Sequence, residues 1–214
     1  MAFGLRSNSQ PVREATLDVV QRLWRTKLKS ITLLEKWLAK TSDLDIKAGL
    51  KTQLADERRH LRMLGEEVAR LGGRLQGSTL DRVLERPFAM IQAQASDAYK
   101  LSAFYHGVKA YTVVRCGRML PFVDQALART LEQISRDEQG HIRWAEIRLS
   151  RIDDIHEQRQ LEFLIDKMEK LLDSIWSKSW IKLTAIRYKY LAPKRYRATL
   201  PENVTVLPSP GSRP

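Results

Sequence analysis

The chain has 214 residues and a formal net charge of +12, with 37 basic side chains against 25 acidic ones. Its single cysteine, Cys116, excludes an intramolecular disulfide and any zinc site built from cysteines. No stretch approaches the roughly 18 uninterrupted apolar residues of a membrane-spanning helix, and the first residues lack the apolar core of a secretory signal. We therefore expect one folded domain in the cytoplasm.

The basic excess is concentrated at the two ends of the chain. Residues 1–40 carry a net charge of +5 and residues 176–214 carry +7, whereas residues 41–175 are neutral. A uniformly basic surface would favour a nucleic-acid-binding protein. The observed distribution instead predicts a charge-balanced body with two basic ends.

Apolar residues recur with helical spacing through almost all of residues 12–191, and no segment alternates as a strand would. We expect helices at about residues 12–40, 42–71, 88–120, 124–152 and 155–191, with Ser42 capping the second. The connections are short, long (72–87) and short, which is typical of an all-α four-helix bundle with one long crossover. The bundle would span residues 12–152 and a fifth helix residues 153–191, with residues 1–11 flexible and residues 192–214 forming a basic, proline-containing tail.

One motif occurs twice, once in the second expected helix and once in the fourth. The sequences DERRH (residues 56–60) and DEQGH (residues 137–141) align at an offset of 81 residues. In each copy the glutamate and the histidine are three residues apart, so they share a helix face, and the apolar neighbours turn that face toward the bundle interior. A buried carboxylate needs compensation from a metal ion, a basic side chain or a proton.

Two Glu-x-x-His motifs in a one-crossover bundle resemble the ferritin-like superfamily, which includes rubrerythrin, bacterioferritin and the di-iron hydroxylases. The resemblance covers residues 12–152 and implies iron or manganese with oxygen or peroxide chemistry. It implies that Glu57 and Glu138 bridge two metal ions and that His60 and His141 each bind one. It also implies one further glutamate from each of the first and third helices.

The sequence departs from the ferritin-like pattern at these two further positions. In an antiparallel hairpin Glu57 faces about residues 25–29, where Lys27 stands among residues without a carboxylate. Glu35 is the remaining candidate ligand in the first helix, although it lies about eight residues, or roughly 12 Å, from the required height. The third helix has no acidic residue between Lys100 and Val123.

The equivalent place in the third helix lies around Lys109. An ammonium group there can neutralise the motif glutamates without any metal. The alternative is a lopsided metal site built from the four motif residues and water. Tyr105, one turn away, is a candidate for a radical or hydrogen-bonding role, or simply packs in the core. Lys109 and Tyr105 are thus the candidate catalytic residues.

The segment of residues 176–197 interleaves basic residues with tryptophans and tyrosines. This pattern suits an anionic membrane surface or an acidic partner protein, or else the aromatic side chains bury the fifth helix against the bundle. No nucleic-acid-binding motif accompanies it.

Two functions of different class follow. The first is a metal-dependent oxidase or hydroxylase that acts on an unidentified small molecule through Glu57, His60, Glu138 and His141. The second is a metal-free scaffold or adaptor that docks through its basic, aromatic C-terminal segment. In the second case the protein is cytoplasmic or peripheral to the membrane, and a homodimer is compatible with both functions.

Overall fold

The computed structural model describes residues 10–75, 79–152 and 154–190, and every regular element in these ranges is helical. The predicted all-α class is therefore confirmed. The flexible segments expected at residues 1–11 and 192–214 lie outside the described residues, apart from residues 10 and 11. The elements are α1 (Gln10–Lys40), α2 (Leu44–Arg70), α3 (Thr79–Gln92), α4 (Asp97–Leu101), the π-helix η1 (Ser102–Lys109), α5 (Ala110–Met119), the short 3-10 helix η2 (Leu120–Phe122), α6 (Gln125–Leu149) and α7 (Ile155–Tyr190).

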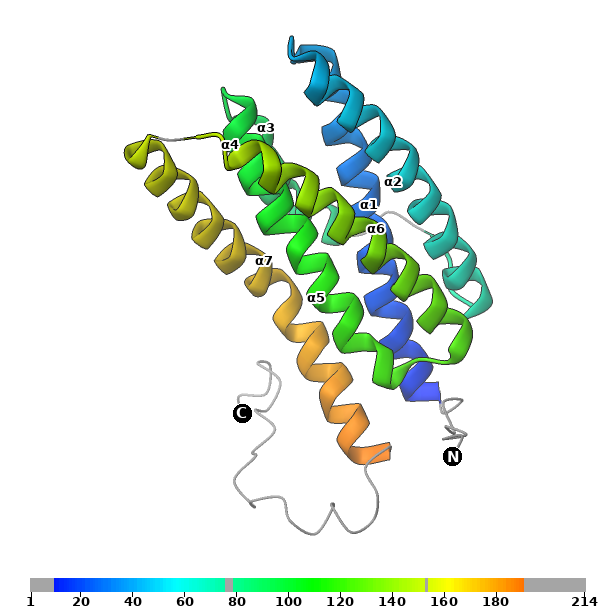
Figure 1. Cartoon of the computed structure of the whole chain (residues 1–214). Helices are drawn as coiled ribbons and strands as arrows, with labels where there is room; N and C mark the ends of the chain where they lie inside the picture. The colour runs from blue at the N-terminus through cyan, green and yellow to red at the C-terminus, as the bar shows by residue number, and fades with distance from the viewer. Residues whose placement is uncertain (1–9, 76–78, 153, 191–214) are drawn as a thin grey trace, which may run out of the picture.

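Four long helical stretches form the bundle: α1, α2, the continuous run of α4, η1 and α5, and α6 (Figure 1). α1 pairs with α2, α5 pairs with α6, and α2 contacts α6 between the two hairpins. α7 lies outside this bundle, against η1, α1 and α3, and Met168 packs closely on Gly107. None of the described helices is both long and apolar enough to cross a membrane.

The third expected helix, residues 88–120, is interrupted in the structure. Residues 88–92 belong to α3, which occupies part of the expected crossover, and a new helix begins at Asp97. Ser96 caps this helix by accepting a hydrogen bond from the Tyr99 backbone N–H at 3.2 Å. The Asp97 carboxylate accepts the indole N–H of Trp37 at 2.6 Å, which ties the break to α1.

Both hairpins begin their second helix with the same cap. Asp43 accepts a hydrogen bond from the Ile46 backbone N–H at 2.9 Å, and Asp124 accepts one from Leu127 at 3.0 Å. The prediction that Ser42 caps α2 is therefore wrong by one residue, because the longer aspartate one position later reaches the same orphan N–H groups. Asp43 and Asp124 are 81 residues apart, like the two DExxH motifs.

The π-helix η1 has more residues per turn than an α-helix because its hydrogen bonds span five residues. Lys109 follows Lys27 by 82 residues, one more than the offset that relates the motifs. The wider turn takes up this extra residue, so both lysines reach the same height in the bundle.

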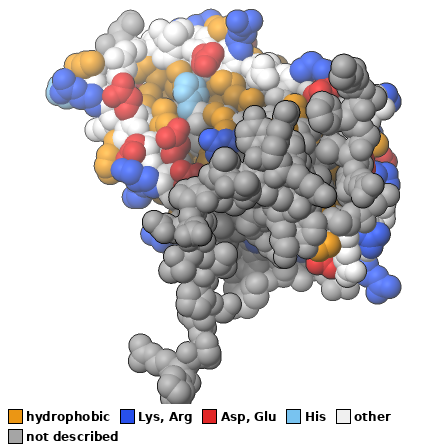
Figure 2. Space-filling model, turned by 90° about the horizontal axis from the view of Figure 1, so that it is seen from below, with side chains coloured by type: hydrophobic (Ala, Val, Ile, Leu, Met, Phe, Trp, Pro, Cys, Tyr) orange, Lys and Arg blue, Asp and Glu red, His pale blue; other side chains and the backbone are white. Residues whose placement is uncertain are grey.

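Apolar side chains form two separate core clusters, one toward each end of the bundle. Along α1 the first cluster ends at Leu23 and the second begins at Ile31, and Lys27 lies between them. The same order holds in α6, where Glu138 lies between Ile134 and Ala145. A buried polar layer thus separates two hydrophobic clusters. On the end of the molecule shown in Figure 2, the described surface mixes acidic and basic side chains around hydrophobic ones.

Candidate functional site

The polar layer consists of six buried side chains contributed by the four bundle stretches. Its members are Lys27 from α1, Glu57 and His60 from α2, Lys109 from η1, and Glu138 and His141 from α6. Glu57, His60 and Glu138 have no exposed surface, and the two lysines are at most 2% exposed. The structure therefore brings together all four motif residues predicted from the sequence.

The two glutamates and two lysines form a closed ring of alternating charge. Lys27 Nζ donates to Glu138 Oε1 and lies 3.2 Å from Glu57 Oε2. Lys109 Nζ donates to Glu57 Oε1, and to Glu138 Oε2 at 2.7 Å. Each ammonium group therefore contacts both carboxylates, which satisfies the need for compensation that buried charges impose.

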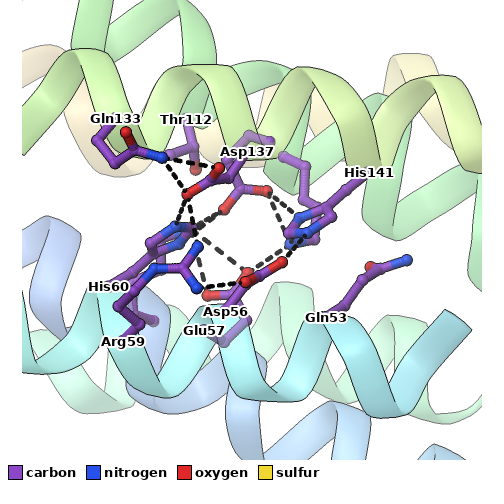
Figure 3. Close-up of polar contacts among 12 residues, drawn as sticks. Gln53, Asp56, Glu57, Arg59, His60, Thr112, Gln133, Asp137 and His141 are labelled. Carbon is purple, nitrogen blue, oxygen red and sulfur yellow. Dashed lines mark hydrogen bonds and ion pairs between the residues drawn. The ribbon is translucent and has the colours of Figure 1, made fainter.

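Reciprocal contacts between α2 and α6 hold the two histidines (Figure 3). His60 Nε2 lies 2.9 Å from Asp137 Oδ2, and His141 Nε2 lies 2.9 Å from Asp56 Oδ2. Each motif therefore begins with the aspartate that holds the histidine of the other motif. A carboxylate beside Nε2 keeps the proton on that nitrogen and leaves Nδ1 as the acceptor.

The two Nδ1 atoms face the centre of the layer. His141 Nδ1 lies 3.2 Å from Lys109 Nζ, which has protons to donate. His60 Nδ1 lies 3.6 Å from Glu138 Oε1 and has no hydrogen bond among the described residues. Glu57 Oε2 also lacks one, although the Lys27 ammonium is close. Buried acceptors without donors are rare in native proteins, so these two atoms mark the layer as more than packing.

Polar side chains cover the outer side of the histidine contacts. The guanidinium of Arg59 bridges the two aspartates, with NH1 2.7 Å from Asp56 and NH2 2.9 Å from Asp137. Gln133 donates a further hydrogen bond to Asp137 at 3.0 Å, as Figure 3 shows. The histidine orientation is therefore fixed by a network on the α2–α6 side.

The ring favours the charged form of its members. Burial alone would lower the pKa of Lys27, but Glu138 and Glu57 outweigh that effect and hold the pKa above its ordinary value. Burial alone would raise the pKa of Glu138, but the Lys109 and Lys27 ammonium groups hold it well below its ordinary value. Lys27 and Glu138 are therefore charged near neutral pH, and Lys27 in this form has no lone pair for nucleophilic or metal-binding chemistry.

Glu57, Glu138 and His141 form a group that could hold a metal ion, because each offers a ligand atom within 4.8 Å of the others. The Lys109 ammonium contacts all three of these residues. A divalent ion and this ammonium would have to occupy the same space and would repel each other. The donor set as it stands therefore does not fit a metal ion while Lys109 is in place.

The other candidate residues lie outside the ring. Glu35 pairs with Arg58 at 2.8 Å on the surface, where both side chains are exposed, so the suggested ligand role of Glu35 is wrong. Tyr105 is buried and donates to Gln53, and burial raises the pKa of its hydroxyl well above the ordinary value. Its ring packs edge-on against Trp37, which agrees with the packing role.

Two features of the site were missed in the sequence analysis. Asp56 and Asp137 were not assigned a role, although both immediately precede a motif glutamate and recur at the same offset. Lys27 was noted at the expected height but not paired with a particular partner. The sequence signal for it was the one-residue difference between the Lys27–Lys109 spacing and the motif spacing.

Comparison with known proteins yields no matching family model, curated protein or solved structure. The function must therefore be argued from the geometry of the layer. A helical bundle with a buried Glu/Glu/His cluster is loosely compatible with a ferritin-like fold.

Proposed function

We propose that this protein is a ferritin-like bundle that works without a metal ion, as a scaffold or adaptor. The observation that carries this proposal is the ring in which Lys27 and Lys109 each contact both Glu57 and Glu138. The charge that a metal site would require is supplied by the chain itself. The ring leaves the bundle with a complete, internally compensated centre and no position for an oxygen-activating ion.

The docking part of the proposal relies on the C-terminal sequence. Residues 176–197 contain seven basic and no acidic side chains, interleaved with five aromatic ones. Their cations and aromatic rings suit an anionic surface such as a lipid headgroup layer. The backbone of α7 continues to Tyr190 as a helix outside the four-helix bundle, so part of this segment is presented on a helix that the bundle does not enclose.

A metal-dependent oxidoreductase is the second candidate. It is favoured by the clustered ligand atoms of Glu57, Glu138 and His141 and by the acceptor atom of His60 that lacks a donor. If a metal binds, these residues would hold it and it would supply oxygen or peroxide activation. The Lys109 ammonium would first have to leave the centre of this group.

Elemental analysis separates the two candidates. The full chain is expressed in medium supplemented with iron and manganese, purified without chelators and measured by inductively coupled plasma mass spectrometry. A metal-free scaffold carries no more iron or manganese than an E57Q/E138Q variant prepared alongside it. One or two equivalents that disappear in E57Q/E138Q would refute the proposal and favour the oxidoreductase.

Docking is tested by co-sedimentation with phosphatidylserine-containing vesicles. We expect the full chain to sediment with them at low salt and to be released at high salt, because surface charge attraction is screened. The K182E/R187E/K189E variant should remain in solution. A K36E/K47E/K51E variant carries the same charge change on α1 and α2 and should still bind.

A further inference from the structure

We infer that the buried ring is a converted dinuclear metal centre, in which Lys27 and Lys109 each stand in for one metal ion together with one carboxylate ligand. The inference rests on the proposed metal-free function and deepens it. It predicts that exchanging only these two lysines for glutamate produces a metal-binding protein.

Charge equivalence is the first argument. A dinuclear carboxylate site takes one glutamate from each of two helices and a Glu-x-x-His pair from each of the other two. Here α2 and α6 supply the Glu-x-x-His pairs, and α1 and η1 supply lysines where glutamates would stand. A carboxylate with its divalent ion carries one net positive charge, as an ammonium group does. Each lysine thus preserves the charge that the motif residues face.

Position is the second argument. A glutamate side chain is one bond shorter than lysine, and a metal ion lies about 2.0–2.2 Å beyond a carboxylate oxygen. An ion held by glutamate at position 27 or 109 would therefore lie near the present ammonium nitrogen. That nitrogen of Lys109 already contacts Glu57, Glu138 and His141, which is the ligand environment that an ion requires.

The histidine contacts supply an independent third argument. A metal-binding histidine usually donates its outer N–H to a carboxylate, which orients the ring and directs the other nitrogen to the metal. His60 and His141 have this arrangement with Asp137 and Asp56, both at 2.9 Å. A simple ion-pair ring does not need it. It leaves His60 Nδ1 fully buried and aimed inward without a hydrogen bond among the described residues.

The test is the K27E/K109E variant of the full chain, purified in EDTA and then titrated with Co²⁺ and Mn²⁺. We expect about two ions per chain, with visible Co²⁺ absorption bands that indicate nitrogen and oxygen ligands. The melting temperature should rise with metal concentration, because an ion that binds the folded state alone stabilises it. If the apo variant is unfolded, it should refold when the metal is added.

Matched variants identify the site. K36E/K51E makes the same charge change at two exposed lysines of α1 and α2 and should bind no Co²⁺ in the EDTA-treated protein. K27E/K109E/H60L should lose at least one of the two ions, because the leucine removes a ligand while filling similar space. The single K109E variant should bind no more than one ion.

The outcomes distinguish this inference from the proposed function. Metal bound by the unaltered chain contradicts the metal-free function. If the unaltered chain binds none, a K27E/K109E variant that is folded but binds no ion contradicts the inference alone. A variant that neither folds nor refolds with metal also contradicts it, since the remaining ligands would then not suffice. Retention of both ions by K27E/K109E/H60L would place the ions elsewhere and overturn the assignment.

Discussion

Removing one ammonium group from the ring should destabilise the protein severely. In K109M a side chain of similar length but without charge faces Glu57, Glu138 and His141, and Lys27 alone must compensate two fully buried carboxylates. Breaking a buried ion pair on one side typically costs about 3–5 kcal/mol, a large part of the roughly 5–15 kcal/mol total stability of a domain. For a chain of this size the melting temperature should fall by about 6–20 °C.

Urea unfolding followed by circular dichroism measures this effect. K51M, at an exposed position of α2, is the control and should stay within about 0.5 kcal/mol of the unaltered chain. Adding E57Q to K109M should recover part of the loss, because it removes one of the two carboxylates left under-compensated. A K109M variant within about 1 kcal/mol of the unaltered chain would refute the ring as a source of stability.

Three further predictions concern the pH dependence, the thiol and two glycines. The Lys109 and Lys27 ammonium groups hold the pKa of Glu138 well below its ordinary 4.5 despite burial, so the stability that Glu138 contributes is present above pH 4.5 and is lost as pH falls below it; urea midpoints from pH 7 to 3 should show this loss, and a flat profile would contradict it. Burial raises the pKa of Cys116 to about 12, so Ellman's reagent at pH 8 should modify the thiol only after unfolding, and rapid labelling of the folded protein would show that the thiol is accessible. In G49A the new methyl group would overlap the Trp144 ring and destabilise the α2–α6 contact, whereas G140A on open α6 surface should stabilise by up to about 1 kcal/mol; equal effects on the melting temperature would contradict the assigned packing.

Local sequence patterns predicted the helices well where apolar periodicity and caps agree. α1, α2 and α6 lie within a few residues of the expected bounds, because long amphipathic stretches leave few alternatives. The third helix was predicted less well. The break before Asp97 depends on its hydrogen bonds with Trp37 and Thr41, which are about 60 residues away along the chain and have no local signal.

The candidate site divides in the same way. The repeated Glu-x-x-His spacing was sufficient to bring Glu57 and Glu138 together, because a helix face and an internal repeat are local properties. The height at which Lys109 enters the layer could be estimated only to within a turn. It depends on the π-helical turn before it, and nothing in the residue pattern distinguishes that turn from an α-helical one.

The polar layer also has a consequence for how the two hairpins align. Lys27 with Glu138, Lys109 with Glu57, and both histidine–aspartate pairs join the first hairpin to the second. The apolar clusters on either side attract without direction and would tolerate a shift along the bundle axis. A slip of one helical turn, about 5.4 Å, would break all four contacts and strand buried charges. Hydrophobic packing therefore holds the hairpins together, while the charged layer sets the single register in which they fit.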